Sequence, residues 1–232
     1  MKFEQKLIPG TLIKRYKRFL ADVKLDNGAL ITAHCPNSGS MKPCKEPGWK
    51  VMLSQSDNPK RKLKYTWEMV HNGVCWIGVN THLANKLAME AIQNGVINEL
   101  QGYDNLKTEV KYGKNSRIDL LLSGNGKKCY VEVKNVTLVE NGFYKFPDAV
   151  TTRGQKHLLE LQEMMRRGHR AVMLYVIQRN DGSIFKPAAD IDPVYSKYLR
   201  EAYAAGVEIL PYLAKVSEWE IMLDSLIPFE LE

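Results

Sequence analysis

Three residues whose types and spacing suit metal chemistry lie in the stretch RIDLLLSGNGKKCYVEVK, residues 117–134. Asp119 belongs to a first apolar run, and Glu132 and Lys134 belong to the next. The Ser-Gly-Asn-Gly between the runs is typical of a tight hairpin turn, because Gly and Asn tolerate positive φ. Side chains alternate along a strand, so we expect Glu132 and Lys134 on the face opposite to Val133.

Carboxylates gathered on one hairpin indicate a divalent-metal site, because an ionised group is costly to desolvate unless it binds something. Asp119 and Glu132 would hold Mg²⁺ (or Mn²⁺), which would also take waters and a phosphate oxygen. Lys134 would lower the pKa of the attacking water. The alternative is a solvated strand face on which Glu132 and Lys134 form an i,i+2 ion pair, since a short motif of this kind is weakly specific.

Elements of α/β type surround this hairpin. Apolar periodicity predicts helices and strands on both sides of it. They are a helix over 83–94, a strand over 107–112, a helix over 151–167, a strand over 171–178, a helix that ends near 205 and a strand over 207–213. The tail after Val216 has an apolar, helix-like pattern. Arg153, Gln155 and Lys156 fall at a helix start, where free N–H groups and the helix dipole favour phosphate.

The first 56 residues are mostly β in pattern and indicate a small barrel of OB type, with Asp26-Asn-Gly as a hairpin turn. Such a barrel binds nucleic acid through basic and aromatic side chains, since bases stack on aromatics while Lys and Arg follow phosphates. The candidates for nucleic-acid binding are Lys14, Arg15, Tyr16, Lys17, Arg18, Lys60, Arg61, Lys62, Lys64 and Tyr65. Phe19, Trp49 and Trp67 are further stacking candidates, each with a core position as the alternative. The loop from His34 to Met41 fits either phosphate binding or plain turn chemistry.

Charge is distributed unevenly along the 232 residues. Residues 1–66 hold fourteen Lys and Arg against five Asp and Glu, whereas the rest hold nineteen against twenty-one. A basic surplus of this kind attracts polyanions, which favours DNA, or RNA, as the partner. The alternative is a solvated basic surface.

The remaining composition favours a cytoplasmic protein, because the sequence contains neither an apolar run of membrane-spanning length nor the apolar region of a signal peptide. The four cysteines are scattered, which favours reduced thiols, with a metal shared by Cys35 and Cys44 as the alternative.

Two resemblances sharpen these expectations. The pattern D-(12 residues)-E-x-K resembles the PD-(D/E)xK nuclease superfamily, although Ile118 stands where that motif has Pro. More of the chain resembles the sugar fermentation stimulation protein A family, through segments spread along its length. These are RYKRFLADV, HCPNSGSM, NPKRKLKYTWE, GVNTHLAN, NSRIDLLL, VEVKNVTL, FPDAVTTRGQKHL and ADIDP.

The resemblances imply an α+β protein in two parts. Residues 1–80 would form an OB-like, basic, nucleic-acid-binding domain, and residues 81–232 a nuclease-like domain of order αβββαβ. Asp119, Glu132 and Lys134 would be the catalytic residues, with the Val133 carbonyl completing the metal ligands and Glu90 as an additional acidic residue.

Two functions follow, and the sequence leaves both open. The first is a largely sequence-independent DNA-binding protein that regulates sugar (maltose) metabolism and carries a Mg²⁺-binding, nuclease-like site. The alternative is an active metal-dependent endonuclease acting on DNA or RNA. A small-molecule regulator is a third class, but the sequence contains no GxxxxGK or GxGxxG.

Overall fold

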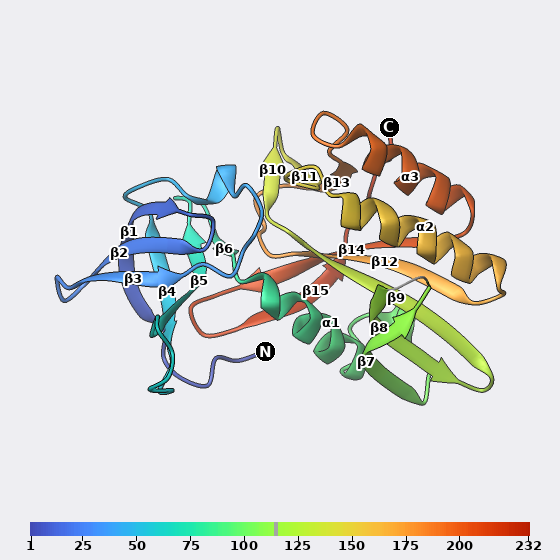
Figure 1. Ribbon diagram of the computed structural model, residues 1–232, viewed down its shortest axis with the longest axis horizontal. Helices are drawn as coiled ribbons and strands as arrows, with labels where there is room; N and C mark the ends of the chain where they lie inside the picture. Colours follow the sequence, from blue (N-terminus) through green and yellow to red (C-terminus); the bar gives the residue numbers. More distant parts are fainter. Residues whose placement is uncertain (114–115) are drawn as a thin grey trace.

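The structure is a computed structural model and describes residues 1–113 and 116–232. Asn115, the first residue of the NSRIDLLL motif, therefore lies outside the described residues. Figure 1 shows a barrel of strands at one end of the molecule and a sheet flanked by helices at the other.

The first sheet closes into a barrel. Its strands are β1 (Ile8–Tyr16), β2 (Leu20–Leu25), β3 (Leu30–His34), β4 (Lys50–Gln55), β5 (Tyr65–His71) and β6 (Trp76–Gly78). The sheet order is β3-β2-β1-β4-β5-β6, and a pairing of His34 with Thr66 joins β3 to β5. Five strands thus form a closed ring of OB type, as predicted. Along β2, Ala21, Val23 and Leu25 are buried in the barrel core, which is the period of two that a half-buried strand requires.

The second sheet has the order β15-β14-β12-β9-β8-β7. Its strands are β7 (Asn105–Tyr112), β8 (Ser116–Gly124), β9 (Lys127–Val136), β12 (Arg170–Ile177), β14 (Glu208–Val216) and β15 (Ile221–Leu226). The helices are α1 (Ala84–Gln93), α2 (Thr152–Arg166) and α3 (Pro193–Ala204). Short 3-10 turns span Lys42–Cys44, Thr81–Leu83 and Asn98–Leu100. The strands β9, β12 and β14 run parallel at the centre.

Helices cover both faces of this sheet. Val172 and Leu174 of β12 share an apolar cluster with α1, whereas Met173 and Tyr175 share another with α2 and α3. All but the first residue of β12 are buried, as expected for a parallel strand between two helical layers. Figure 1 shows α2 and α3 together on the side opposite to α1.

The element order α1-β7-β8-β9-α2-β12 is the predicted αβββαβ order, so the fold prediction is confirmed. The hairpin turn is confirmed as well: Asn125 and Gly126 have φ of 50° and 73°, the left-handed region in which Asn and Gly are tolerated.

Two features differ from the predictions. The tail forms strand β15 instead of a helix, because Ile221 and Leu223 point inward while Met222 and Asp224 point outward, a period of two. A small sheet of β10 (Leu138–Glu140), β11 (Phe143–Phe146) and β13 (Ile184–Pro187) was not predicted. Its strands are short, and although β10 and β11 form a local hairpin, β11 also pairs with β13, which is distant in sequence, so the local pattern is weak.

The barrel and the second sheet pack against each other. Leu7, Met52 and Met69 of the barrel side belong to the same apolar cluster as α1. Buried Arg179 donates to the Thr137 carbonyl at 2.6 Å and pairs with Asp181. Asp181 in turn accepts from Asn72 of the barrel side at 2.8 Å. The orientation of the two parts is therefore held by both apolar and polar contacts.

All four cysteines are buried and free. Cys35 Sγ lies 3.5 Å from Met41 Sδ, and Cys44 Sγ donates to the Thr137 carbonyl at 3.6 Å. Across the described ranges, no helix is both long and apolar enough to cross a membrane.

Candidate functional site

Asp119 lies where two strands of the hairpin separate. The pairing of β8 with β9 runs from the turn as far as Leu120 and Val131. Beyond that point Asp119 Oδ2 accepts a hydrogen bond from the Val133 N–H at 2.8 Å, and Oδ1 accepts from Asn85 Nδ2 of α1 at 2.9 Å. The carboxylate therefore takes the place of the missing ladder bond and is held on both oxygens.

Glu132 and Lys134 share the face that packs towards α2, opposite to Val131 and Val133. Glu132 is 1% exposed. Its Oε1 accepts from Lys134 Nζ at 2.6 Å and also contacts His157 Nδ1 of α2. Glu132 Oε2 is buried and has no hydrogen-bond partner among the residues that the structure describes. One carboxylate oxygen is thus shared by two nitrogen groups, and the other is left without a partner.

The pKa values of the two carboxylates are shifted in opposite directions. Burial alone would raise the pKa of Glu132, but Lys134 and His157 outweigh burial and hold this pKa below its usual value. The pKa of Asp119 is raised, first by burial and then by the charge of Glu132. A cation between them would relieve this conflict.

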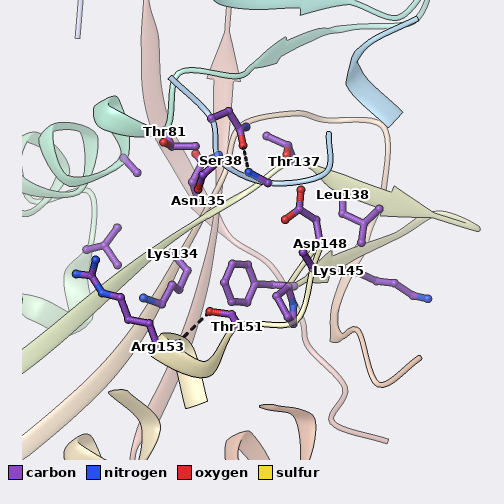
Figure 2. A pocket seen from close by; sticks show the side chains of 18 of the residues that line it. Ser38, Thr81, Lys134, Asn135, Thr137, Leu138, Lys145, Asp148, Thr151 and Arg153 are labelled. Carbon is purple, nitrogen blue, oxygen red and sulfur yellow. Dashed lines mark hydrogen bonds between the residues drawn. The ribbon is translucent and has the colours of Figure 1, made fainter. Parts of the chain in front are cut away.

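Both carboxylates and Lys134 line one pocket of about 500 Å³. Three further segments complete its walls: the barrel loop 37–39 with Arg18, the start of α1 at 81–85, and the segment 145–154 that leads into α2. Figure 2 shows Ser38, Thr81 and Asn135 at one end of this pocket, with Lys134 and Arg153 at the other.

The donor set fits Mg²⁺ or Mn²⁺. Glu132 Oε2 needs a partner, Asp119 is close enough to be perturbed by Glu132, and the Val133 carbonyl belongs to a residue that lines the same pocket. Mg²⁺ binds through one or two carboxylates and completes its shell with water and phosphate oxygens. In the described part of the chain, no group of three or more His, Cys, Asp or Glu gathers as a larger metal cluster.

The predicted phosphate-positioning residues separate in the structure. Arg153 lines the pocket, and its Nε lies 3.4 Å from His157 Nε2. Lys156 lies one turn away, lines an adjacent cavity together with Arg153, and is 3.6 Å from Glu160. Gln155 uses its amide to hold Asp192, at 2.9 and 3.1 Å to the two oxygens. In this structure the Gln155 amide thus completes the capping of α3, and a phosphate contact by Gln155 stays a prediction.

Glu90 also lies elsewhere. Its carboxylate pairs with the amino group of Met1 at 2.7 Å, and Glu90 does not line the pocket. The residue of α1 that reaches Asp119 is Asn85.

The basic residues of the barrel face different ways. Arg15 donates to the carbonyls of Asn37 and Gly39 at 2.9 and 3.0 Å, so in this structure it holds the protein's own loop. Lys14 lies 3.7 Å from Asp22. Arg18 reaches the pocket. The exposed basic candidates are Lys14, Lys17, Arg18, Lys60, Lys62 and Lys64.

The remaining barrel candidates are tied to their neighbours. Arg61 donates to Thr66 Oγ1 at 3.0 Å. Tyr16 donates to Asp22 at 3.1 Å, and Tyr65 packs against the barrel core.

The other stacking candidates divide by burial. Trp67 is fully buried in the barrel core, so it cannot stack a base. Trp49 packs against the same core. Phe19 is 44% exposed and is the most open of these aromatics.

Several site residues were not predicted. Asn85, His157 and Asp148 become neighbours of the hairpin or the barrel loop only through folding. The available signal was a histidine in register with an apolar helix face: His157 is 3% exposed and lies on the buried face of α2 with Leu158 and Leu161. In the loop, the Asn37 side chain accepts from the Gly39 N–H at 2.9 Å, which is turn chemistry, while Ser38 lines the pocket.

The fold and the site together define a class of protein: an OB-like barrel joined to a nuclease-like α/β unit. Comparison with known proteins agrees and gives the family. The family described as "SfsA N-terminal OB domain" matches residues 13–79, and "Sugar fermentation stimulation protein RE domain" matches residues 82–220. The chain belongs to the sugar fermentation stimulation protein family.

Individual relatives cover nearly the whole chain. A sugar fermentation stimulation protein homolog of Geotalea uraniireducens is 61% identical over 211 residues, which is 91% of each chain. The homolog of Geobacter sulfurreducens is 60% identical over 222 residues, 96% of this chain and 95% of that one. The structure of SfsA from Pyrococcus furiosus in complex with Ca²⁺ is similar with a TM-score of 0.89 and 27% identity, over 99% of this chain and 98% of the other.

Proposed function

We propose that the chain is a largely sequence-independent DNA-binding protein whose second part carries a divalent-metal site able to hydrolyse a phosphodiester. The observation that carries this proposal is the pocket that Asp119, Glu132 and Lys134 all line, with Glu132 Oε2 buried and unpartnered among the described residues. The relative from Pyrococcus furiosus was solved in complex with Ca²⁺, which supports a divalent cation in this family.

Each residue has a defined part in the reaction. Asp119, Glu132 and the Val133 carbonyl would hold Mg²⁺ (or Mn²⁺), which when bound polarises the phosphoryl group and acidifies water. Lys134 places an ammonium beside Glu132, where it stabilises a hydroxide as it forms. Arg153 lines the same pocket and neutralises charge that develops on the phosphoryl oxygens.

The binding part of the proposal depends on charge. The barrel side holds the basic surplus, and Lys60, Lys62 and Lys64 are exposed there. Exposed lysines contact phosphates without reading bases, so little sequence specificity follows. RNA is a second candidate polyanion on the same grounds.

DNA binding without cleavage is the second candidate function. It is favoured by one contact: Lys134 Nζ and His157 Nδ1 both lie on Glu132 Oε1, so the lysine is already paired. In that case the pocket would hold a cation and a phosphate without hydrolysing the phosphodiester.

The deciding experiment is cleavage of DNA and RNA substrates with Mg²⁺, Mn²⁺ or EDTA. We expect metal-dependent cleavage by the wild type and its loss in Glu132→Gln, which keeps the side-chain shape and can still meet Lys134. Lys134→Met should lose cleavage by about 100-fold or more. Its metal affinity, measured by calorimetry, should stay within a few-fold of wild type.

Glu90→Gln is the matched control, because it removes a carboxylate that lies outside the pocket. It should cleave like the wild type. If the wild type cuts no nucleic acid with either metal, the hydrolytic part of the proposal is wrong and binding alone remains.

A further inference from the structure

The barrel forms one wall of the pocket, and that wall is sealed against the second part. Asp148 Oδ2 accepts from the Met41 N–H at 3.2 Å and from the Ser40 hydroxyl at 3.4 Å. A Cβ on Gly39 would lie 2.3 Å from the same oxygen, so the loop and Asp148 leave no space between them. On this side the pocket is therefore closed by the direct contact between the barrel loop and Asp148.

A strained turn brings a cation to this wall. Lys17 and Arg18, between β1 and β2, have φ of 45° and 63°, a region that costs a non-glycine residue free energy. Arg18 lines the pocket with Asp119 and Lys134. Ser38, which is exposed and lines the same pocket, adds a hydroxyl. Together they give the barrel wall a phosphate-binding character.

The segment that follows Asp148 gives the pocket an apolar edge. Val150 lines the pocket and is 68% exposed, and Ala149 next to it is also exposed. An exposed apolar side chain beside a polar, charged pocket suits the face of a nucleobase. In a duplex that face is already stacked on its neighbours, so only an unpaired base can offer it.

The size of the pocket limits what can enter it. Its volume of about 500 Å³ falls in the range of sites that enclose a small ligand. Glu132, which is 1% exposed, lies within it, so a phosphodiester must descend between the walls to reach the carboxylates. A volume of this size suits a small-molecule-sized ligand such as a nucleotide or two of one strand, and the two paired strands of a duplex exceed it.

We propose that this pocket takes an unpaired DNA strand, held by Arg18 and Ser38 from the barrel on its phosphates and by Val150 on a base. The inference rests on the proposed function, since it names the substrate class of the same site. Duplex DNA binds only outside the pocket, at the exposed lysines of the barrel.

The test is binding of three labelled DNA probes of one sequence, measured by fluorescence anisotropy in Ca²⁺. The probes are a single strand, a blunt duplex, and a duplex with a single-stranded tail. Ser38→Trp fills the barrel wall, and we expect it to weaken binding of the single strand and the tailed duplex by about tenfold or more. Blunt-duplex binding should change by less than about twofold.

Two control substitutions show whether the effects belong to the pocket. Leu30→Trp places the same bulk on an exposed barrel position that does not line the pocket, and it should change none of the three affinities. Val150→Ser should weaken single-strand binding, whereas Val74→Ser, at an equally exposed valine of the barrel side, should not. This second pair remains decisive if Ser38→Trp does not fold.

The outcomes separate this inference from the proposed function. Unchanged single-strand binding in the folded Val150→Ser protein, or equal losses for strand and blunt duplex, would overturn the strand proposal even if the protein cuts DNA. Lack of cleavage in Mg²⁺ would overturn hydrolysis and leave the binding result standing.

Discussion

Glu132 shows how a single side chain serves both structure and chemistry. Its Oε1 is bound by Lys134 and by His157, whereas its Oε2 has no partner within the described residues. A buried, unpaired carboxylate oxygen is costly and persists where function requires it. His157 fixes the orientation of the carboxylate, so it is a positioning residue in the proposed site.

Glu68 of β5 is a buried carboxylate with a different role. It is 5% exposed and accepts hydrogen bonds from Ser54 at 2.5 Å and from Asn80 at 2.7 Å. Burial raises its pKa in spite of these bonds. The folded state therefore binds the proton more tightly than the unfolded state does. This contribution to stability is complete below the ordinary glutamate pKa and is lost as pH rises through the folded pKa.

Glu68→Gln should remove that pH dependence. We expect the difference in melting temperature, variant minus wild type, to increase by a few degrees as pH rises from about 5 to about 8. Thermal melts across this range measure the difference, with exposed Glu46→Gln as the control. A constant difference between Glu68→Gln and wild type at all pH values would contradict the assignment.

At the scale of elements, the contact between the barrel loop and Asp148 sets the distance between the two parts. Gly39→Ala would force its Cβ against the Asp148 carboxylate. We expect a lower melting temperature, by about 2–4 °C for each kcal/mol of lost stability in a chain of this size. Differential scanning calorimetry measures this change.

The double-mutant cycle supplies the control. In an Asp148→Ala background, Gly39→Ala should cost clearly less, because the clashing carboxylate is gone. Equal costs in both backgrounds would show that the loop can move away from Asp148, and the pocket wall would then be less rigid than the structure indicates.

At the scale of the molecule, the basic surplus of the first 66 residues should govern DNA affinity. Replacing Lys60, Lys62 and Lys64 by Gln should weaken binding to all duplexes alike and reduce the salt slope by about three, since each lost phosphate contact removes about 0.9. Arg61 is left in place because it bonds to Thr66.

Titration at several salt concentrations measures this prediction. Lys86, Lys107 and Lys128, which are exposed in the second part, provide a matched triple replacement that should leave the slope nearly unchanged. Equal effects of the two triple variants would refute the placement of the DNA on the barrel side.

The division into residues 1–80 and 81–232 is a further prediction at this scale. A fragment that begins near Gly73 would cut within the barrel sheet, because β6 pairs with β5. A fragment of residues 81–232 should fold but melt below the full chain, since it loses Leu7, Met52 and Met69 from the cluster shared with α1. It should also bind DNA less tightly. Calorimetry of the fragment measures this, and failure to fold alone would mean that the parts are one cooperative unit.

Much of the fold follows from local patterns. The hairpin, helices α1 and α2 and strand β12 were predictable, because apolar period and turn residues such as Asn125 and Gly126 act within a few positions. Strand β15 was not, because a short run of apolar and polar residues fits either period and its partner β14 decides between them. The strands β10, β11 and β13 were not predicted because each has only three or four residues, too few for a period to show.

The sequence by itself determined the αβββαβ order, the placement of Glu132 and Lys134 on one strand face, and the basic character of the barrel side. Only the tertiary structure decided which polar side chains meet. It turned Arg15 onto its own loop and Gln155 onto Asp192, and it brought Arg18 to the pocket and His157 to Glu132. Periodicity depends on neighbours along the chain, whereas these contacts depend on how distant elements pack, which no local pattern encodes.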